Sequence, residues 1–388
     1  MRSQGSAAIL ALLLGACTIA EPGPTTPAPP PATRLPGQVL IDREARQSAL
    51  AASPEQAERY CGAPDQRWRS YPAPEPLAPT AEHATDTRLN PFAWVIMRGA
   101  AAAIGTGDQE ARATVVKAID RWARSQALAE IESKDAAVIY GVNRLLLPTI
   151  VAWSLVRDAP EVNQTIRRRV DAWLIAMVER SEAYADAAKP TETITRNNHH
   201  YLSASVSMAL GSLIDDPLRV QRGIAAYRSA LAELRPDGSL PLETARGARA
   251  LWYQRHAIAS LVTIAEMGAL LGYDLYGLKV EGRSLHDAVG YLARAVGDPE
   301  LVAGYAAANV NPGPSERWWE QELGFLETRG HGRHYMAWLE PYLARFPRSR
   351  DGNALADRLG LDRSRPLVDE YGGGNLTCFF APLRPPVG

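Results

Sequence analysis

Apolar and polar residues alternate along most of this chain with the period of an α-helix. From about Pro91 onward, apolar residues recur at spacings of three and four, and clusters of Gly, Pro and Asp interrupt them. Runs typical of β-strands are nearly absent. The pattern therefore predicts an all-α protein with helices over residues 91–104, 110–131, 137–156, 161–185, 198–213, 217–234, 245–271, 285–296 and 335–346.

Short connections between these helices predict antiparallel pairs. Residues 157–160 and 215–217 are too few to let neighbouring helices separate, so each pair should form a hairpin. Stacked hairpins make a bundle, a solenoid or a closed toroid. Residues 91–347 contain neither a linker-like segment nor a repeat of fixed period, which favours a single helical domain over residues 38–388.

The N-terminus indicates export. Arg2 precedes an apolar run over residues 7–14, and small residues lead to Cys17, as in a signal peptide that ends in a lipobox. We expect residues 1–16 to be removed, Cys17 to be lipidated, and residues 17–37, rich in Pro, to form a tether. This predicts a periplasmic or cell-surface protein with a lipid anchor in the outer membrane. The alternative is ordinary secretion without a lipid on Cys17.

Composition limits the class of ligand. The 388 residues carry a formal net charge of −1, and no basic tract with interleaved aromatic residues is present, so nucleic acid is not an expected partner. Hydrophobic residues make up 46% of the chain, enough for a large core in a monomer. An anionic ligand would have to be bound locally, in a cleft lined by a few Arg, Asn and His residues.

Cysteine and histidine residues do not predict a metal site. Cys61 and Cys378 lie near the two ends of the globular part, in a compartment where disulfides persist, and are either bonded or two separate buried thiols. His199 and His200 point apart if they are adjacent on a helix, and His331 and His334 lack further ligands at a suitable spacing. No metal and no other cofactor is predicted.

The first block with candidate chemistry is Thr195–Tyr201. Asn197 is a natural N-cap for the helix that follows, which places Asn198 and His199 in its first turn. Free backbone N–H groups and the helix dipole favour a bound anion there, such as a carboxylate. The alternative is that these polar residues only cap the helix.

The second block runs from Asp237 to Ile258. Asp237 and Gly238 form a predicted turn, and Arg249, Tyr253 and His256 follow at positions i, i+4 and i+7, on one face of a helix. A guanidinium, a phenol and an imidazole on one stripe are unusual in a core. The alternative is a solvated face that carries one aromatic residue.

Three blocks together resemble the alginate lyases, mannuronate-specific polysaccharide lyases of bacterial periplasms. The family motif Asn-Asn-His-x-Tyr is similar to residues 197–201, and Asp-Gly-x-Leu-Pro-x-Glu, followed by an Arg-Ala-Leu segment, is similar to residues 237–243 and 248–253. A third family segment, Tyr-Ala-Trp-Leu-Glu-Pro-Tyr, is similar to residues 335–342. The resemblance spans roughly residues 110–345. It implies an α/α toroid, an incomplete barrel of antiparallel helix hairpins.

The resemblance also implies roles for individual residues. Asn198 and Arg249 would bind the C6 carboxylate of a uronic acid, and His199 would transfer a proton. The chain departs from the family at His256, where the family places its catalytic Tyr, seven residues after the Arg. Further predicted substrate contacts, including aromatic platforms for sugar rings, are Asn197, His200, Tyr201, Arg246, Trp252 and Trp338.

The predicted activity is β-elimination in a β-1,4-linked polyuronate, either polymannuronate (alginate) or glucuronan. His199 would remove the C5 proton, and His256 or Tyr253 would protonate the leaving oxygen; alternatively, one of these two residues does both. A glycoside hydrolase would instead need two carboxylates, and Glu243 and Glu340 are available, although their positions are more typical of capping or packing. A third possibility is a non-catalytic lipoprotein that only binds the polysaccharide.

Overall fold

The computed structural model describes residues 37–62, 90–129, 136–189, 191–310, 317–329 and 332–383. The predicted signal peptide, Cys17 and the tether up to residue 36 lie outside these residues. The described α-helices are α1 (Arg43–Ala51), α2 (Pro54–Cys61), α4 (Asn90–Gly105), α5 (Gln109–Arg124), α6 (Ala136–Val156), α7 (Gln164–Ala187), α8 (Asn198–Ile214), α9 (Pro217–Glu233), α10 (Pro241–Thr244), α11 (Ala250–Leu270), α12 (Leu285–Gly297), α13 (Glu300–Ala306), α14 (Leu339–Arg345), α15 (Arg350–Leu359) and α16 (Leu376–Phe380).

Three 3₁₀ turns and one small sheet complete the described secondary structure. The turns are η1 (Thr193–Thr195), η2 (Gly247–Arg249) and η3 (Gly324–Leu326). The strands β1 (Val368–Asp369) and β2 (Gly374–Asn375) pair antiparallel, with Val368 opposite Asn375. The prediction of an all-α protein is therefore confirmed.

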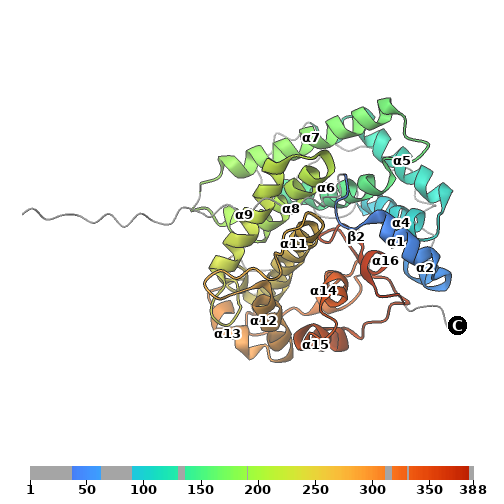
Figure 1. Cartoon of the computed structure of the whole chain (residues 1–388). Coiled ribbons are helices and arrows are strands. Elements are labelled where there is room, and N and C mark those ends of the chain that lie inside the picture. The colour runs from blue at the N-terminus through green and yellow to red at the C-terminus, as the bar shows by residue number, and fades with distance from the viewer. Residues whose placement is uncertain are drawn as a thin grey trace, which may run out of the picture.

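The helices form an α/α toroid of two concentric rings (Figure 1). Helices α4, α6, α8, α11 and α14 follow one another round the inside, and each packs against the next. Helices α5, α7, α9, α12 and α15 lie outside them, each in contact with the inner helix that precedes it. Each outer helix returns the chain, so the inner helices run in one direction and their first turns meet at one end of the toroid.

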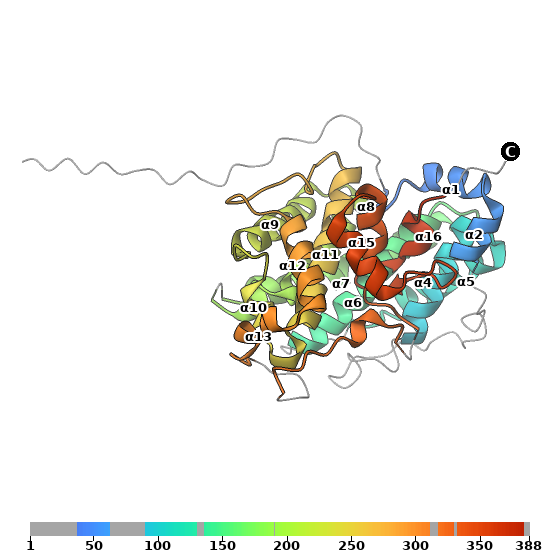
Figure 2. The ribbon, with the colours of Figure 1, turned by 90° about the horizontal axis from the view of Figure 1, so that it is seen from below.

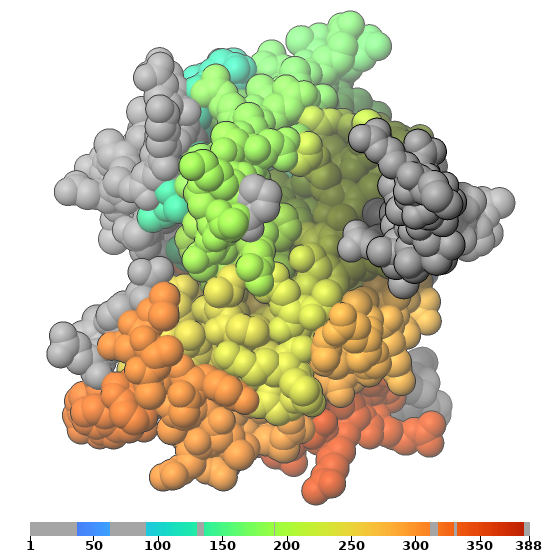
Figure 3. Space-filling view, turned by 90° about the vertical axis from the view of Figure 1, so that its left-hand side faces the viewer, coloured from blue at the N-terminus to red at the C-terminus, as the bar shows by residue number. Residues whose placement is uncertain are grey.

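Other views of the molecule show that chain order follows the ring. In Figure 2, α9, α12 and α13 lie on one flank, and α2 and α5 lie on the other. Figure 3 looks onto the outer wall, where the green segment of α7 lies above the yellow and orange segments of α9 to α13. Buried residues from Val39 to Ala381 belong to one continuous core cluster. The toroid is thus built round a single core.

Local chemistry explains why the hairpins turn where they do. Helix α8 ends at Asp215, whose φ of 64° is left-handed, and the backbone N–H of Asp216 bonds to Gly211. Asp216 then caps α9 by accepting from the N–H groups of Leu218 and Arg219, and Pro217 occupies the first helical position. A left-handed stop followed by an acidic cap and Pro is a strong signal for two consecutive helices.

Helix α6 is apolar all round because it lies inside the ring. It is long and apolar enough to cross a membrane by length and composition, but 83% of its most apolar window is buried within the protein. A helix that is hydrophobic on every side is typical of a core element. Thr149 and Ser154 lie in its second half, and Tyr140, Asn143 and Arg144 fall near its first turns. These turns lie at the end of the toroid where the first turn of α8 is found.

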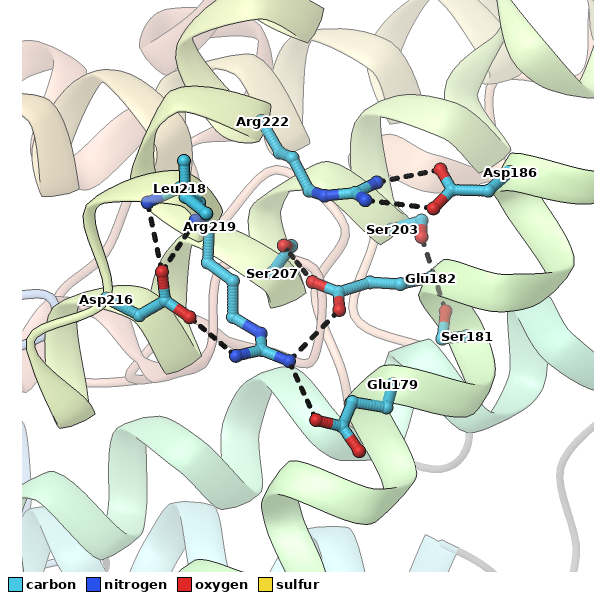
Figure 4. A network of polar contacts seen from close by, with 10 residues as sticks. All are labelled: Glu179, Ser181, Glu182, Asp186, Ser203, Ser207, Asp216, Leu218, Arg219 and Arg222. Carbon is cyan, nitrogen blue, oxygen red and sulfur yellow. Dashed lines mark hydrogen bonds and ion pairs between the residues drawn. The ribbon is translucent and has the colours of Figure 1, made fainter.

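A polar network ties α7, α8 and α9 together near the middle of α8 (Figure 4). Arg219 forms ion pairs with Asp216, Glu179 and Glu182, and Glu182 also accepts from the hydroxyl of Ser207 on α8. The pair of Arg219 with Glu182 is mostly buried, so it fixes the position of α8 more firmly than an exposed pair would.

The C-terminal segment returns to α2 and closes the ring. Helix α16 packs on α2, α4 and α14, and a disulfide joins Cys61 to Cys378 across 317 residues. Asn375 donates from Nδ2 to the carbonyl of Tyr60 and caps α16 by accepting from the N–H of Cys378. Of the two alternatives that the sequence left open for these cysteines, the structure has the bonded one.

The predicted helix bounds agree with the structure to within three residues except at three ends. The helix predicted over 110–131 ends at Arg124, because Gln126 and Leu128 have positive φ. The helix predicted over 245–271 begins at Ala250, because the left-handed φ of 57° at Gly247 interrupts the α-helical conformation. The helix predicted over 335–346 is shorter, over residues 339–345. Helices α1, α2, α10, α13, α15 and α16 were not predicted, because short helices give little periodic signal.

Candidate active site

The first turn of α8 is held by a buried carboxylate. Asn197 is the N-cap, as predicted, and its side chain accepts from the N–H of His199 at 3.0 Å. Glu243, on α10, accepts from the backbone N–H of Asn198 at 2.6 Å and from its Nδ2 at 2.8 Å. Glu243 thus supplies a second cap from another element. It fixes the turn from which His199 projects.

Glu243 is fully buried, and this burial changes the pKa of its carboxyl. Burial raises the pKa of Glu243 to about 7, against the opposing effect of the bond from Asn198 and of the charge on Arg246. Both carboxylate oxygens are engaged with Asn198. Glu340, the other carboxylate of the hydrolase alternative, is fully buried and paired with Arg363 and Thr377. Both residues have the capping and packing roles that their sequence positions suggested.

His199 is half-buried and offers its ring to the site. Its imidazole stacks on the ring of Tyr140 from α6, with centroids 4.1 Å apart and planes 19° apart. Within the described residues, its ring nitrogens make no hydrogen bond, so either can meet a ligand. Burial, and then the charge of Arg246, lowers the pKa of His199 to about 4. The imidazole is therefore neutral near pH 7 and has a free lone pair.

A pocket opens beside this stacked pair. It is a small hollow with a cavity volume of about 20 Å³, and it is partly open to solvent. Apolar side chains of α6 and α7 form much of its wall, and polar groups gather on the side of α8. It is lined by Ala136, Ile139, Tyr140, Asn143, Tyr184, Ala185, Ala188, Ile194, Thr195, His199, His200 and Ser203.

The segment that leads into α11 places Arg246 near His199 and carries a second arginine, Arg249, three residues later. Arg249, the N-cap of α11, pairs through Nε with Glu322 at 2.9 Å. The guanidinium of Arg246 lies over the ring of Tyr253, 3.7 Å from its centroid. The Tyr253 ring in turn meets His256 edge-on at 5.7 Å between centroids. The predicted stripe of Arg249, Tyr253 and His256 is present, and Arg246 adds a second positive charge to it.

His256 is buried, and both of its ring nitrogens are occupied. The indole Nε1 of Trp252, one helical turn earlier, donates to Nε2 at 3.1 Å. The other nitrogen, Nδ1, lies 2.9 Å from the hydroxyl of Tyr140, and this hydroxyl donates to that of Tyr371 at 3.0 Å. Burial, followed by the charge of Arg255, holds the pKa of His256 well below its usual range. Residues from α6, α11 and the C-terminal segment are thus joined in one row.

A buried ionic cluster lies under this row. Glu370 pairs with Arg144 at 2.8 Å and with Arg333, while the guanidinium of Arg255 lies 5.4 Å from the centroid of the Tyr371 ring. Burial alone would raise the pKa of Glu370, but Arg144 and Arg333 outweigh it and lower that pKa. The excess of positive charge next to Tyr140 and Tyr371 favours a negative charge at this end of the toroid.

The structure brings together most of the predicted site residues. His199, His200, Arg246, Arg249, Trp252 and Tyr253 are half-buried near the first turns of α8 and α11, with His256 below them. Asn197 and Asn198 are buried there and hold the turn. Direct contact of either asparagine with a substrate carboxylate stays a prediction, because the amide nitrogen of Asn198 already donates to Glu243.

Two predicted substrate contacts are buried away from the pocket. Trp338 is fully buried next to Tyr342, inside the wall of the toroid, and belongs to the core. Tyr201 is also buried, and its hydroxyl donates to the carbonyl of Arg196 at 2.7 Å. Both were chosen because they belong to motif blocks. Helical geometry turns them toward the interior, since residues next to each other in a helix point in different directions.

Two tyrosines of the site were missed. Tyr140 lies 116 residues before His256, and Tyr371 lies 231 residues after Tyr140. A signal for the first exists in the sequence, because Tyr140, Asn143 and Arg144 interrupt an apolar helix at i, i+3 and i+4 and so share one face. Tyr371 lies in a short Gly-rich turn and gives no comparable signal.

Comparisons with known proteins identify the family and the fold. The family model described as Alginate lyase matches residues 43–302. A curated protein from Stenotrophomonas maltophilia, named Polysaccharide lyase, is 38% identical over 146 residues. That match covers 38% of this chain, and the chain spans only 41% of the length of that relative.

Solved structures share the fold. Alginate lyase A1-III from Sphingomonas species A1 is 22% identical, with a TM-score of 0.72 over 90% of this chain and 97% of that one. A variant of the same enzyme complexed with tetrasaccharide has a TM-score of 0.71 at 23% identity, over 90% and 96% of the two chains. An alginate lyase from Bacteroides ovatus has a TM-score of 0.61 at 13% identity, over 89% and 100%. The match of the family model over most of the toroid shows that this chain belongs to the alginate lyase family.

Proposed function

We propose that this protein is a polysaccharide lyase that cleaves a β-1,4-linked polyuronate, polymannuronate or glucuronan, by β-elimination. The observation that carries the proposal is His199. It is neutral, its ring nitrogens are without partners in the described part of the chain, and it lies beside the positive charge of Arg246. A base next to cationic donors is what removal of a proton adjacent to a carboxylate requires.

In the proposed reaction, His199 removes the proton and the two arginines stabilise the charge that develops. His199 takes the proton from C5, the electron pair of that bond forms the C4–C5 double bond, and the bond from C4 to the glycosidic oxygen breaks. Negative charge develops on the C6 carboxylate as the proton leaves. Arg246 and Arg249 would stabilise that charge as preorganised cationic donors. Arg249 is kept in place by its pairing with Glu322.

The relatives support a saccharide ligand but not its identity. A family member has been solved with a bound tetrasaccharide. Mannuronate and glucuronate both place the C5 proton and the C4 oxygen on the same face of the ring, and they differ only at C2. A single arrangement of base and acid therefore serves either polymer, whereas guluronate carries its C5 proton on the opposite face.

The test is a panel of polymannuronate, polyguluronate, glucuronan and hyaluronan, incubated with the mature protein and followed by ultraviolet absorbance of the unsaturated end. We expect absorbing oligosaccharides from polymannuronate or glucuronan and none from polyguluronate. New reducing ends without absorbance would show a hydrolase instead. Binding of a polyuronate with no product at any pH would show a protein that only binds polysaccharide.

We also propose that the protein is an exported lipoprotein anchored through Cys17. The support is the apolar run over residues 7–14 and the small residues that precede Cys17. In a Gram-negative host, the full chain should incorporate a labelled fatty acid and fractionate with the outer membrane. Cys17→Ala should abolish both, and a soluble, unlabelled wild-type protein would contradict the anchor.

A further inference from the structure

The hydrogen bonds round His256 fix which nitrogen carries its proton. The indole of Trp252 can only donate, so Nε2 of His256 must accept and Nδ1 must hold the hydrogen. Nδ1–H then donates to the oxygen of Tyr140, 2.9 Å away, and the hydroxyl hydrogen of Tyr140 points to Tyr371. The row has one direction, from Trp252 through His256 and Tyr140 to Tyr371.

This direction leaves His256 without a base or an acid function. Its only lone pair accepts from Trp252, and its neutral ring cannot give up the Nδ1 proton without becoming an imidazolate. The side chain is 6% exposed, so a sugar ring cannot reach it. His256 stands where the family has its catalytic Tyr, but its contacts are those of a residue that orients a neighbour.

Tyr140 has the opposite properties. It is half-buried, lines the pocket and stacks on His199. We propose that Tyr140 is the proton donor to the leaving glycosidic oxygen and that His256 is a positioning residue for it. The phenol that the family supplies from the middle of α11 is supplied in this chain from α6. This inference rests on the proposed function, and it names the acid of that reaction.

The stacking of the two rings suits the stereochemistry. In mannuronate and glucuronate the C5 proton and the C4 oxygen leave from one face, so base and acid must approach from the same side. His199 and Tyr140 are nearly parallel, with centroids 4.1 Å apart, and their polar edges can face one sugar together. A base and an acid on opposite walls of a cleft could not act on such a substrate.

The proton and electron balance is complete with these two residues. His199 accepts the C5 proton, the C4–O bond breaks, and Tyr140 turns its O–H from Tyr371 to the leaving oxygen and protonates it. The resulting phenolate keeps the hydrogen bond from Nδ1–H of His256, and Arg144 and Arg255 lie near enough to lower the pKa of Tyr140. Burial and Tyr371 outweigh these charges and raise that pKa well above its usual range, so the phenol begins protonated. The proton on His199 restores the phenol through solvent.

The main test compares Tyr140→Phe with wild type on the best polymer of the panel. We expect kcat to fall by about 10²–10⁴-fold, as for loss of a general acid, with little change in KM. A short uronide with fluoride at C4 needs no proton on its leaving group. Tyr140→Phe should eliminate fluoride from it at nearly the wild-type rate, and His199→Ala should not. Equal losses of Tyr140→Phe on both substrates would overturn the assignment.

Two variants of His256 separate positioning from catalysis. Asn places an N–H donor where Nδ1–H lies, so His256→Asn should keep kcat within about tenfold of wild type, while His256→Ala should lose much more. If Asn and Ala are equally inactive and Tyr140→Phe is fully active, His256 is the acid and the inference fails. Tyr227→Phe is the matched control, because its buried hydroxyl has no partner and its loss should leave kcat unchanged. If the wild type releases no unsaturated product at all, the proposed function fails, and these variants do not bear on it.

Discussion

The two histidines of the site show how differently one side chain can be used in two regions of the same toroid. His199, at the first turn of α8, has a half-buried ring whose nitrogens are without partners in the described residues. His256, in the middle of α11, is buried and has a partner on each nitrogen. Burial lowers the pKa of both, so both are neutral near pH 7. The difference in function therefore comes from access and hydrogen bonding and not from charge.

The comparison teaches that a titratable residue in a catalytic motif need not be the one that exchanges protons. A catalytic base needs a lone pair that faces the substrate, and His199 has one. A positioning residue needs fixed partners, and Trp252 and Tyr140 give these to His256. Both residues are held by an inner helix of the toroid, His199 by α8 and His256 by α11. What differs is the neighbouring element that covers each ring.

The largest effect is expected from His199→Ala. Removing the imidazole next to Arg246 should lower kcat by about 10²–10⁴-fold on the natural polymer. Because the pKa of His199 is about 4, the acidic limb of kcat/KM in the wild type should fall near pH 4, well below that of an ordinary histidine. A limb near pH 6 to 7, or a variant with near-normal kcat, would point to another base.

A smaller loss of activity is expected from Glu243→Gln. The change removes a charge that caps α8, and the Gln amide should turn the side chain of Asn198, whose Oδ1 has no partner at present. We expect kcat to fall by about tenfold, equivalent to roughly one hydrogen bond in the transition state.

The same substitution has a signature in stability. A carboxyl whose pKa is raised by folding binds its proton more tightly in the folded protein. The contribution of Glu243 to the free energy of unfolding is therefore fully present below pH 4.5 and is lost as pH rises toward 7. The difference in pKa corresponds to about 3 kcal/mol. Glu243→Gln should flatten this part of the plot of unfolding free energy against pH, measured with urea. An unchanged slope would show that Glu243 is ionised in the native protein throughout this range.

Trp252→Phe should have a modest effect and would sharpen the contrast between the histidines. Loss of the indole N–H frees Nε2 of His256, and the proton of the ring is then no longer confined to Nδ1. Tyr140 would lose its fixed donor for part of the time, and kcat should fall about fivefold. The nitrogen chemical shifts of His256, measured by NMR, should move toward a mixture of tautomers, while those of His199 stay as they were. A single unchanged tautomer would contradict the assigned direction of the row.

The least effect on activity is expected from removing the disulfide. Cys61→Ser with Cys378→Ser breaks a bond between α2 and α16, which are not part of the site. The free energy of unfolding, measured with denaturant, should fall by about 2–5 kcal/mol, because a long loop is no longer closed in the unfolded chain. At a temperature where the variant stays folded, kcat should remain within twofold of wild type. A large loss of kcat would show that the ring closure also shapes the site.

Much of the helical frame could be predicted from the chain alone. Asp215, Asp216 and Pro217 mark a helix stop and a helix start, and Asn197 marks the cap that precedes His199, because these signals act within a few residues. The stripe of Arg249, Tyr253 and His256 follows from helical periodicity in the same way. The burial of Trp338 and Tyr201 could not be predicted, because a motif shows that a residue is present but not which way it faces.

The sequence by itself determined the toroid of helices, the capped turn that presents His199 and the family to which the chain belongs, since all of these depend on local propensity or on motif order. Only the tertiary structure decided that Glu243 holds Asn198, that Tyr140 stacks on His199, and that both ring nitrogens of His256 are hydrogen-bonded, one to Trp252 and one to Tyr140. The physical reason is distance along the chain. Partners from α6, α11 and the C-terminal turn meet only when the ring closes, and no local preference records such a contact.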